Sequence, residues 1–145
     1  MSEANRTIIY RWFEEVWNQG RLETVDELLA PDGMLYGLTE TGAPAKGPAE
    51  FRPFAERFRG AFPDVRITVL NTAVEGELAA LTWEATMTHR GDHLGIPATG
   101  RKVAFTGQSM ARIVNGKIVE GWNNWDRHAL LQQLGVLDQA AVSSR

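Results

Sequence analysis

The spacing of the apolar residues changes once along the chain, at Pro63-Asp64, and this change constrains the fold most strongly. Before it, apolar residues recur every three or four positions, as on one face of a helix. After it, they alternate with polar residues, as in strands that bury one face. Helices followed by consecutive strands predict an α+β fold. We therefore expect a cone-shaped α+β barrel, in which N-terminal helices lie over a curved antiparallel sheet and enclose an apolar pocket.

Two helices are predicted at the start of the chain. Residues 22–29 form the shorter one, which is expected to end before Pro31 because a residue that precedes proline disfavours helical geometry. The longer helix covers residues 3–18, ends at Gly20, and carries an apolar face made of Ile8, Ile9, Trp12, Phe13, Val16 and Trp17.

A strand, a loop and a third helix are predicted next. Residues 34–38 fit a short strand, and residues 39–48, rich in glycine, proline and alanine, predict a mobile loop over the pocket mouth. Pro48 fits the first position of the third helix. Pro53 lies inside this helix and is expected to kink it or to delay its start.

The second part of the chain predicts strands and one closing helix. Asn115-Gly116 is a strong signal for a two-residue hairpin turn between the last two strands. Asp126 is expected to cap a helix over residues 127–134, and residues 136–145 to form a loose tail. The whole chain, 1–145, then forms one domain. The predicted strands cover residues 65–73, 78–89, 101–114 and 117–125.

Small residues on the inner face of the sheet predict room for a ligand. Alternation buries Gly107 and Ser109 beneath the aromatic helices, and such a gap in an apolar interior suits a small molecule. The alternative is a bent strand with glycine at the bend. The residues expected to bind the substrate are Trp12, Phe13, Trp17, Tyr36, Phe54, Phe58, Trp83, Met87, Phe105, Ser109, Trp122 and Asn124.

Composition and charge narrow the possible partners. A net charge of −3 gives no basic field for nucleic acid or an anionic membrane, and no apolar run reaches the ~20 residues of a membrane span. The first residues do not resemble a signal peptide, so a cytoplasmic location is expected. The absence of cysteine removes thiolate metal sites, and Gly91 and Gly95 break the spacing around His89 and His93. We therefore expect no metal, and no cofactor motif is present.

Three residues could carry chemistry. Asp126 follows Trp125 and could exchange a proton near neutrality, although a helix cap is its competing role. His89 shares the buried face of its strand with Trp83 and could act as a general acid or base, or be a hydrogen-bonded core histidine. Asn123, like its neighbour Asn124, could donate a hydrogen bond to an enolate oxygen, or be a turn residue before a helix.

Several short segments, in this order and spacing, resemble the SnoaL-like polyketide cyclases of the nuclear-transport-factor-2-like fold. They are Val16-Trp17-Asn18-Gln19-Gly20, Thr88-His89-Arg90-Gly91, Gly95-Ile96-Pro97-Ala98-Thr99-Gly100, Asn115-Gly116-Lys117-Ile118 and Leu131-Gln132-Gln133-Leu134-Gly135. The resemblance implies a homodimer that closes rings by an intramolecular aldol reaction, without a cofactor and with an acid-base aspartate in a hydrophobic pocket.

The resemblance also shows where this chain departs from the family. Asn123 occupies the position of the family's aspartate, and Gly107 and Ser109 stand where those cyclases carry Gln and His. His89 and Asp126 match family positions, and Trp17 and Phe54 match residues that line the pocket. Alternation from the hairpin turns Trp122 and Asn124 inward, whereas the resemblance implies that Asn123 faces the pocket. A β-bulge within residues 119–123 would reconcile the two.

The leading hypothesis is a cofactor-independent acid-base enzyme that cyclises, isomerises or hydrolyses a hydrophobic, carbonyl-bearing cyclic or polyketide-like molecule. Asp126 and His89 would transfer protons, and Asn123 would hold an oxyanion. A binding protein without activity and a partner-binding domain that uses the outer sheet face are alternatives. An epoxide hydrolase is a further one, although residues 82–86 lack the Arg-x-Asp of the limonene-epoxide hydrolases. A ketosteroid-isomerase-like site would need Tyr36 with Glu40 or Asp32.

Overall fold

The computed structural model describes residues 2–39 and 42–136, which form a helical layer and a six-stranded sheet. The helices are α1 (Ser2–Arg11), η1 (Trp12–Asn18), α2 (Glu23–Leu28), α3 (Gly47–Ala61) and α4 (Arg127–Leu134). The strands are β1 (Leu29–Tyr36), β2 (Ala45–Lys46), β3 (Arg66–Glu75), β4 (Leu78–Thr88), β5 (Lys102–Val114) and β6 (Lys117–Trp125).

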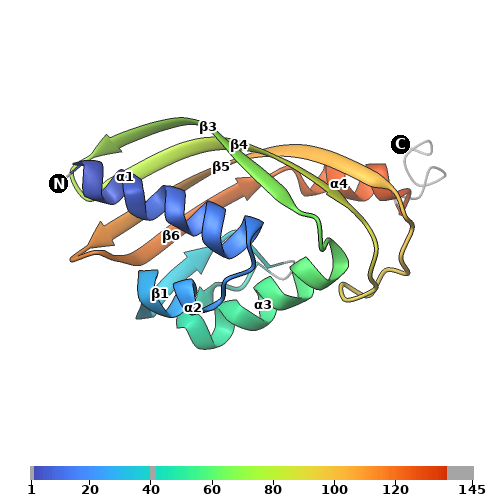
Figure 1. Ribbon diagram of the computed structural model, residues 1–145, viewed down its shortest axis with the longest axis horizontal. Helices are drawn as coiled ribbons and strands as arrows, with labels where there is room; N and C mark the ends of the chain where they lie inside the picture. Colours follow the sequence, from blue (N-terminus) through green and yellow to red (C-terminus); the bar gives the residue numbers. More distant parts are fainter. Residues whose placement is uncertain (1, 40–41, 137–145) are drawn as a thin grey trace.

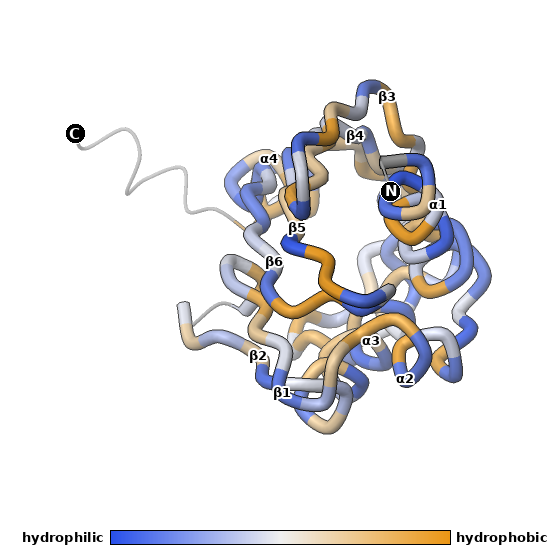
Figure 2. Tube along the Cα trace, turned by 90° about the vertical axis from the view of Figure 1, so that its left-hand side faces the viewer, coloured by the Kyte–Doolittle hydropathy of each residue, from blue (hydrophilic) through white to orange (hydrophobic). Residues whose placement is uncertain are grey.

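The predicted fold class is confirmed. The sheet curves over the N-terminal helices (Figure 1), and in the turned view the strands follow an arc with α1, α2 and α3 on its open side (Figure 2). The strand order is β2-β1-β6-β5-β4-β3, so the sheet is not closed on itself. One detail is corrected: β1 pairs with β6 in parallel, which makes the sheet mixed rather than antiparallel. Alternation alone does not reveal which distant strands pair, or in which direction.

The first helix changes its winding at Trp12. The predicted apolar face is confirmed, because Trp12, Phe13, Val16 and Trp17 are buried, but residues 12–18 form a π-helix, which the apolar spacing did not predict. Asn18 ends this segment against the edge strand β3. Its Nδ2 donates to the carbonyl of Ile67 (2.9 Å), and its Oδ1 accepts from the amide of Ile67 (2.7 Å).

The segment after α2 differs from the prediction. β1 begins at Leu29 and passes through Pro31, whereas a strand was expected only from Met34 onward. Proline is tolerated because the pairing of β1 with β6 is interrupted between Leu29 and Met34, so no partner requires the missing N–H. α3 also continues through Pro53, and its start at Gly47 shows no delay.

The C-terminal half follows the prediction closely. Asn115 and Gly116 adopt positive φ angles of 52° and 76° at the predicted hairpin turn, and Asp126 caps α4 as predicted. The predicted tail, apart from Val136, lies outside the described residues, as does Glu40. None of the helices in the described ranges is long and apolar enough to cross a membrane.

Candidate functional site

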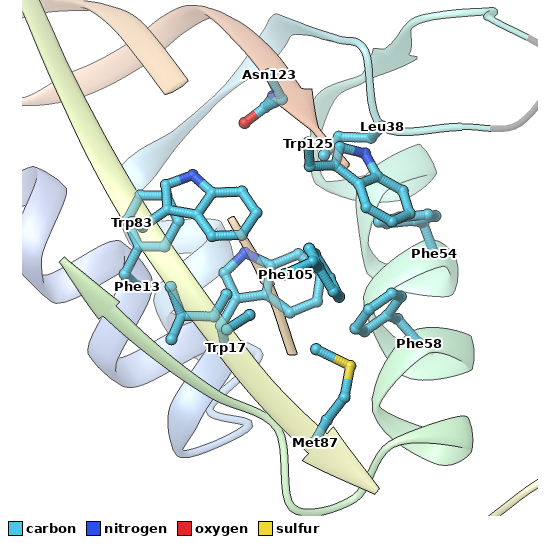
Figure 3. A pocket seen from close by; sticks show the side chains of 12 residues that line it. Phe13, Trp17, Leu38, Phe54, Phe58, Trp83, Met87, Phe105, Asn123 and Trp125 are labelled. Atoms are coloured by element: carbon cyan, nitrogen blue, oxygen red, sulfur yellow. The ribbon is translucent and has the colours of Figure 1, made fainter. Parts of the chain in front are cut away.

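Two adjacent cavities lie between the helical layer and the inner face of the sheet. Their volumes are about 50 and 30 Å³. The larger one (Figure 3) is lined by Phe13, Trp17, Leu38, Phe54, Phe58, Ile67, Trp83, Ala85, Met87, Phe105, Asn123 and Trp125. The predicted apolar pocket is therefore present, but it is much smaller than the ~300–1,000 Å³ of typical ligand sites.

The chemistry of the cavity lining is almost entirely apolar. Apart from the indoles of Trp17, Trp83 and Trp125, Asn123 is the only polar side chain among the described residues that lines the larger cavity, and the smaller one adds Ser109. Among the residues that the structure describes, no ionisable side chain lines either cavity. The described residues also contain no group of three or more His, Cys, Asp or Glu side chains that could hold a metal ion.

A chain of hydrogen bonds fixes the amide of Asn123. Trp83 Nε1 donates to Ser109 Oγ (3.0 Å), which donates to Asn123 Oδ1 (2.8 Å), and Asn123 Nδ2 donates to the carbonyl of Tyr36 (3.0 Å). An indole N–H only donates and a carbonyl only accepts, so both ends dictate which way the amide points. Asn123 keeps one N–H and one lone pair on Oδ1 for a bound molecule.

The predicted β-bulge places Asn123 inside. In the pairing of β5 with β6, Ile113 lies opposite Ile118 but Arg112 lies opposite Glu120, so Val119 is an extra residue. The faces of β6 are exchanged beyond this point.

Three predicted substrate-binding residues therefore lie elsewhere. Trp122 and Asn124 line a groove on the outer sheet face, where Trp122 stacks on Tyr36. Simple alternation placed Trp122 and Asn124 inward because it ignored the bulge. Neither of them, nor Tyr36, lines the inner cavities.

Gly107 does not provide the room that it predicted, whereas Ser109 lines the smaller cavity. A Cβ atom on Gly107 would lie 2.2 Å from Cζ2 of Trp83, because the indole lies directly across this glycine. Ser109 accepts the indole N–H. Gly107 and Ser109 thus accommodate Trp83, and the cavity lies on the far side of that ring.

His89 is completely buried but lies outside both cavities. The backbone N–H of Thr99 donates to Nδ1 (3.2 Å), which also lies 3.1 Å from Thr99 Oγ1, whereas Nε2 is buried without a hydrogen-bond partner among the described residues. The ring packs against Phe62. This geometry fits the alternative of a hydrogen-bonded core histidine. By binding Thr99, His89 joins the two ends of the loop formed by residues 90–100.

Asp126 is exposed and acts as a helix cap. Its Oδ1 accepts from the backbone N–H of Ala129 (2.9 Å). The side chain borders a shallow groove on the outer face rather than the inner cavities. The structure thus separates Asp126 and His89 from Asn123, with which the leading hypothesis had grouped them.

The aromatic lining was predicted well, with two informative omissions. Trp12 and Ser109, both predicted, line the smaller cavity. Seven further predicted residues line the larger one: Phe13, Trp17, Phe54, Phe58, Trp83, Met87 and Phe105. Ile67 and Ala85 were not predicted to line the site, and Leu38 and Trp125, at the cavity mouth, were also missed. Alternation continued from Asn123 would have found Trp125, whereas Leu38 follows the end of β1 and has no periodic signal.

Three side chains hold the segment Tyr36–Leu38, here called the strap, at the cavity mouth. Asn123 donates to the carbonyl of Tyr36, Trp125 Nε1 donates to that of Gly37 (3.1 Å), and Arg127 Nη2 donates to that of Leu38 (3.0 Å). The guanidinium carbon of Arg127 also lies 4.8 Å from the centre of the Trp125 ring. Asn123, Trp125 and Arg127, spaced two residues apart, thus donate to three successive carbonyls of the strap.

Comparisons with known proteins agree with this geometry. The family model of the SnoaL-like polyketide cyclases matches residues 7–134. The structure of IdmH from Streptomyces antibioticus, a proposed polyketide cyclase, is 33% identical, covers 91% of this chain and 99% of its own, and has a TM-score of 0.77. AclR from Streptomyces galilaeus, a proposed hydroxylase, is 25% identical over 100% of this chain and 95% of its own, with a TM-score of 0.82. No curated protein matches the sequence.

Proposed function

The chain belongs to the SnoaL-like polyketide cyclase family, and we propose that it is a cofactor-independent cyclase acting on a hydrophobic, carbonyl-bearing, polyketide-like molecule. The inner cavity would hold this molecule folded, with one of its carbonyl oxygens at the free N–H of Asn123. The observation that carries the proposal is this single oriented amide in an otherwise apolar lining.

The chemistry is an intramolecular aldol addition that starts from the enol form of the substrate. The enol carbon attacks a carbonyl carbon of the same molecule, a C–C bond forms, and the enol proton ends on the new hydroxyl oxygen, so no atom is gained or lost. Asn123 would stabilise the negative charge that develops on that oxygen, and the apolar lining strengthens this hydrogen bond by excluding water. Holding the reacting carbons together would supply the remaining acceleration.

This proposal replaces proton transfer by Asp126 and His89, because neither side chain lines the cavities. An amide does not ionise near neutrality, so we expect kcat/KM to be flat from about pH 5 to pH 8 once ionisation of the substrate itself is subtracted.

The test compares two neighbouring asparagines of β6 in a cyclisation assay with a tethered 1,3-diketone. Asn123→Leu is expected to lower kcat by about 100-fold, as for other oxyanion donors. Asn124→Leu, on the outer face, and Asp126→Asn, which preserves the cap, are expected to retain activity. Inactivity of Asp126→Asn with an intact fold would contradict the proposal and favour acid-base catalysis. Asn123→Asp, which restores the family's aspartate, is expected to add a pH dependence.

A second candidate is a binding protein without turnover, which the absence of an ionisable side chain from the described cavity lining favours. Trp17, Trp83 and Trp125 line the cavity, so a bound ketone should quench their fluorescence in either case. Recovery of the ligand unchanged after long incubation would favour this candidate. A cytoplasmic homodimer remains part of the proposal, to be checked by cell fractionation and sedimentation.

A further inference from the structure

We infer that Leu38 determines the size of the molecule that the cavity admits, and that the strap carrying it is the part of the lining that moves. This inference rests on the proposed function only in assuming a hydrophobic ketone as the ligand. It concerns a residue that lies outside the predicted site.

Leu38 lies between the two cavities. Four residues line both of them, namely Phe13, Trp17, Leu38 and Asn123. Phe13 and Trp17 belong to η1, and Asn123 to β6, whereas Leu38 follows the end of β1. Only Leu38 is therefore free of a helix or strand that would hold it in place.

The cavity has to widen before a polyketide-like molecule can enter. Its volume of about 50 Å³ leaves space for little more than water, and the side chains of Leu38 and Trp125 lie close together at one end of it (Figure 3). Movement of Leu38 away from this position would join the two cavities, because it is a shared part of their lining.

The bonds that hold the strap are suited to release. Beyond the last paired residues, Tyr36 and Trp122, the described part of the strap is held to β6 and α4 by side-chain donors. The closed arrangement also leaves Arg127 Nε buried without a hydrogen-bond partner, a cost that opening would relieve. Breaking two hydrogen bonds, those of Trp125 and Arg127, would release the carbonyls of Gly37 and Leu38 while the bond from Asn123 to Tyr36 remains.

The first experiment measures binding of acetyl-benzene, acetyl-naphthalene and acetyl-anthracene by tryptophan quenching. Leu38→Ala is expected to bind the anthracene ketone about tenfold more tightly, while affinity for the benzene ketone changes little. Leu38→Trp is expected to exclude the two larger ketones. Leu22→Ala is the matched control, since Leu22 is also a partly buried leucine but lines neither cavity.

The second experiment tests the strap by stopped-flow mixing with the anthracene ketone. Trp125→Phe combined with Arg127→Met is expected to raise the association rate at least fivefold, because each lost hydrogen bond favours the open state. Arg112→Met, which loses hydrogen bonds to Glu77 and Glu120 away from the strap, is the control for loss of a guanidinium and should leave the association rate unchanged.

The outcomes separate this inference from the proposed function. If the wild type binds the ketones and Leu38→Ala leaves their size preference unchanged, the inference is overturned and the cyclase proposal stands. If the size preference changes but no variant cyclises any substrate, Leu38 keeps its role and the cyclase proposal fails. Absence of quenching by all three ketones in every variant overturns the inference.

Discussion

The two faces of β6 carry almost the same side chains in very different surroundings. Inside, Asn123 and Trp125 line the apolar cavity; outside, Trp122 and Asn124 line an open groove. Each face thus offers one amide and one indole. The inner amide is held by Ser109 and Tyr36 and is partly buried among apolar side chains, so its remaining N–H can bind a carbonyl more strongly than an amide on the exposed face. Residue type alone therefore did not distinguish the two faces, and the register of the strand did.

Deletion of Gly121, which lies beyond the bulge, would break this comparison most severely. If Glu120 stays opposite Arg112, the shortened strand turns Asn123 and Trp125 outward; if the bulge is lost instead, Glu120 is buried. We therefore expect a loss of more than about 4 kcal/mol in unfolding free energy, or no folding. Urea unfolding followed by circular dichroism measures this. Val119→Ala keeps the register and should cost no more than about 1 kcal/mol. A deletion variant as stable as the wild type would show that the register of β6 does not set the faces.

Gly107→Ala tests the same contrast on β5. The new Cβ would lie 2.2 Å from the Trp83 indole, which also packs against Phe13 and Phe105, so we expect a loss of about 1–3 kcal/mol in urea unfolding. Were the space free, alanine would instead stabilise the strand. Gln108→Ala, one residue along and exposed on the outer face, should change stability by less than about 0.5 kcal/mol.

The helical layer shows a similar contrast between its faces. η1 turns Phe13 and Trp17 toward the cavity, while Glu15 on its other side binds Arg11 and Thr24. The hydrogen bond from Arg11, followed by that from Thr24, lowers the pKa of Glu15 from 4.5 to about 2. Glu15 therefore stabilises the fold above pH 4.5, and this stabilisation is lost as the pH falls toward 2.

Glu15→Gln sharpens this contrast with the smallest expected effect. At pH 7 the variant should lose roughly 1 to 2 kcal/mol, less than the full pKa shift implies because Arg11 is partly exposed to water. The difference from the wild type should shrink as the pH falls from 4.5 to 2, and thermal unfolding across this range measures it. Ligand binding at pH 7 should persist. A constant difference at every pH would show that the carboxylate charge of Glu15 is not responsible.

Local signals explain which parts of the fold were predictable. The Asn115-Gly116 turn, the Asp126 cap and the bounds of β6 depend on neighbouring residues, and all three were predicted correctly. The pairing of β1 with β6 and the π-helix depend on distant partners and backbone geometry that periodicity does not encode. The aromatic lining was predictable because burial and helix or strand period coincide there.

The polar part of the site was harder to predict. Asp126 and His89 are reactive residue types at plausible positions, but the structure uses Asp126 as a cap and places His89 against Phe62. Asn123 could be preferred over Asn124 as the inward-facing amide only through the resemblance, because its orientation depends on a bulge. Trp83 was expected to line a gap over Gly107, yet its ring fills that gap. Side-chain size therefore predicted a cavity at the right sheet face but at the wrong residue.

The contact between Asn18 and Ile67 has a consequence for the behaviour of the protein in a crowded solution. β3 is the last strand of the sheet, and an unpaired strand edge is a template on which other chains can add and aggregate. The side-chain amide of Asn18 occupies both the N–H and the C=O of Ile67, the two groups that an incoming strand would use. The residue that ends the π-helix therefore also protects this edge against intermolecular β-pairing.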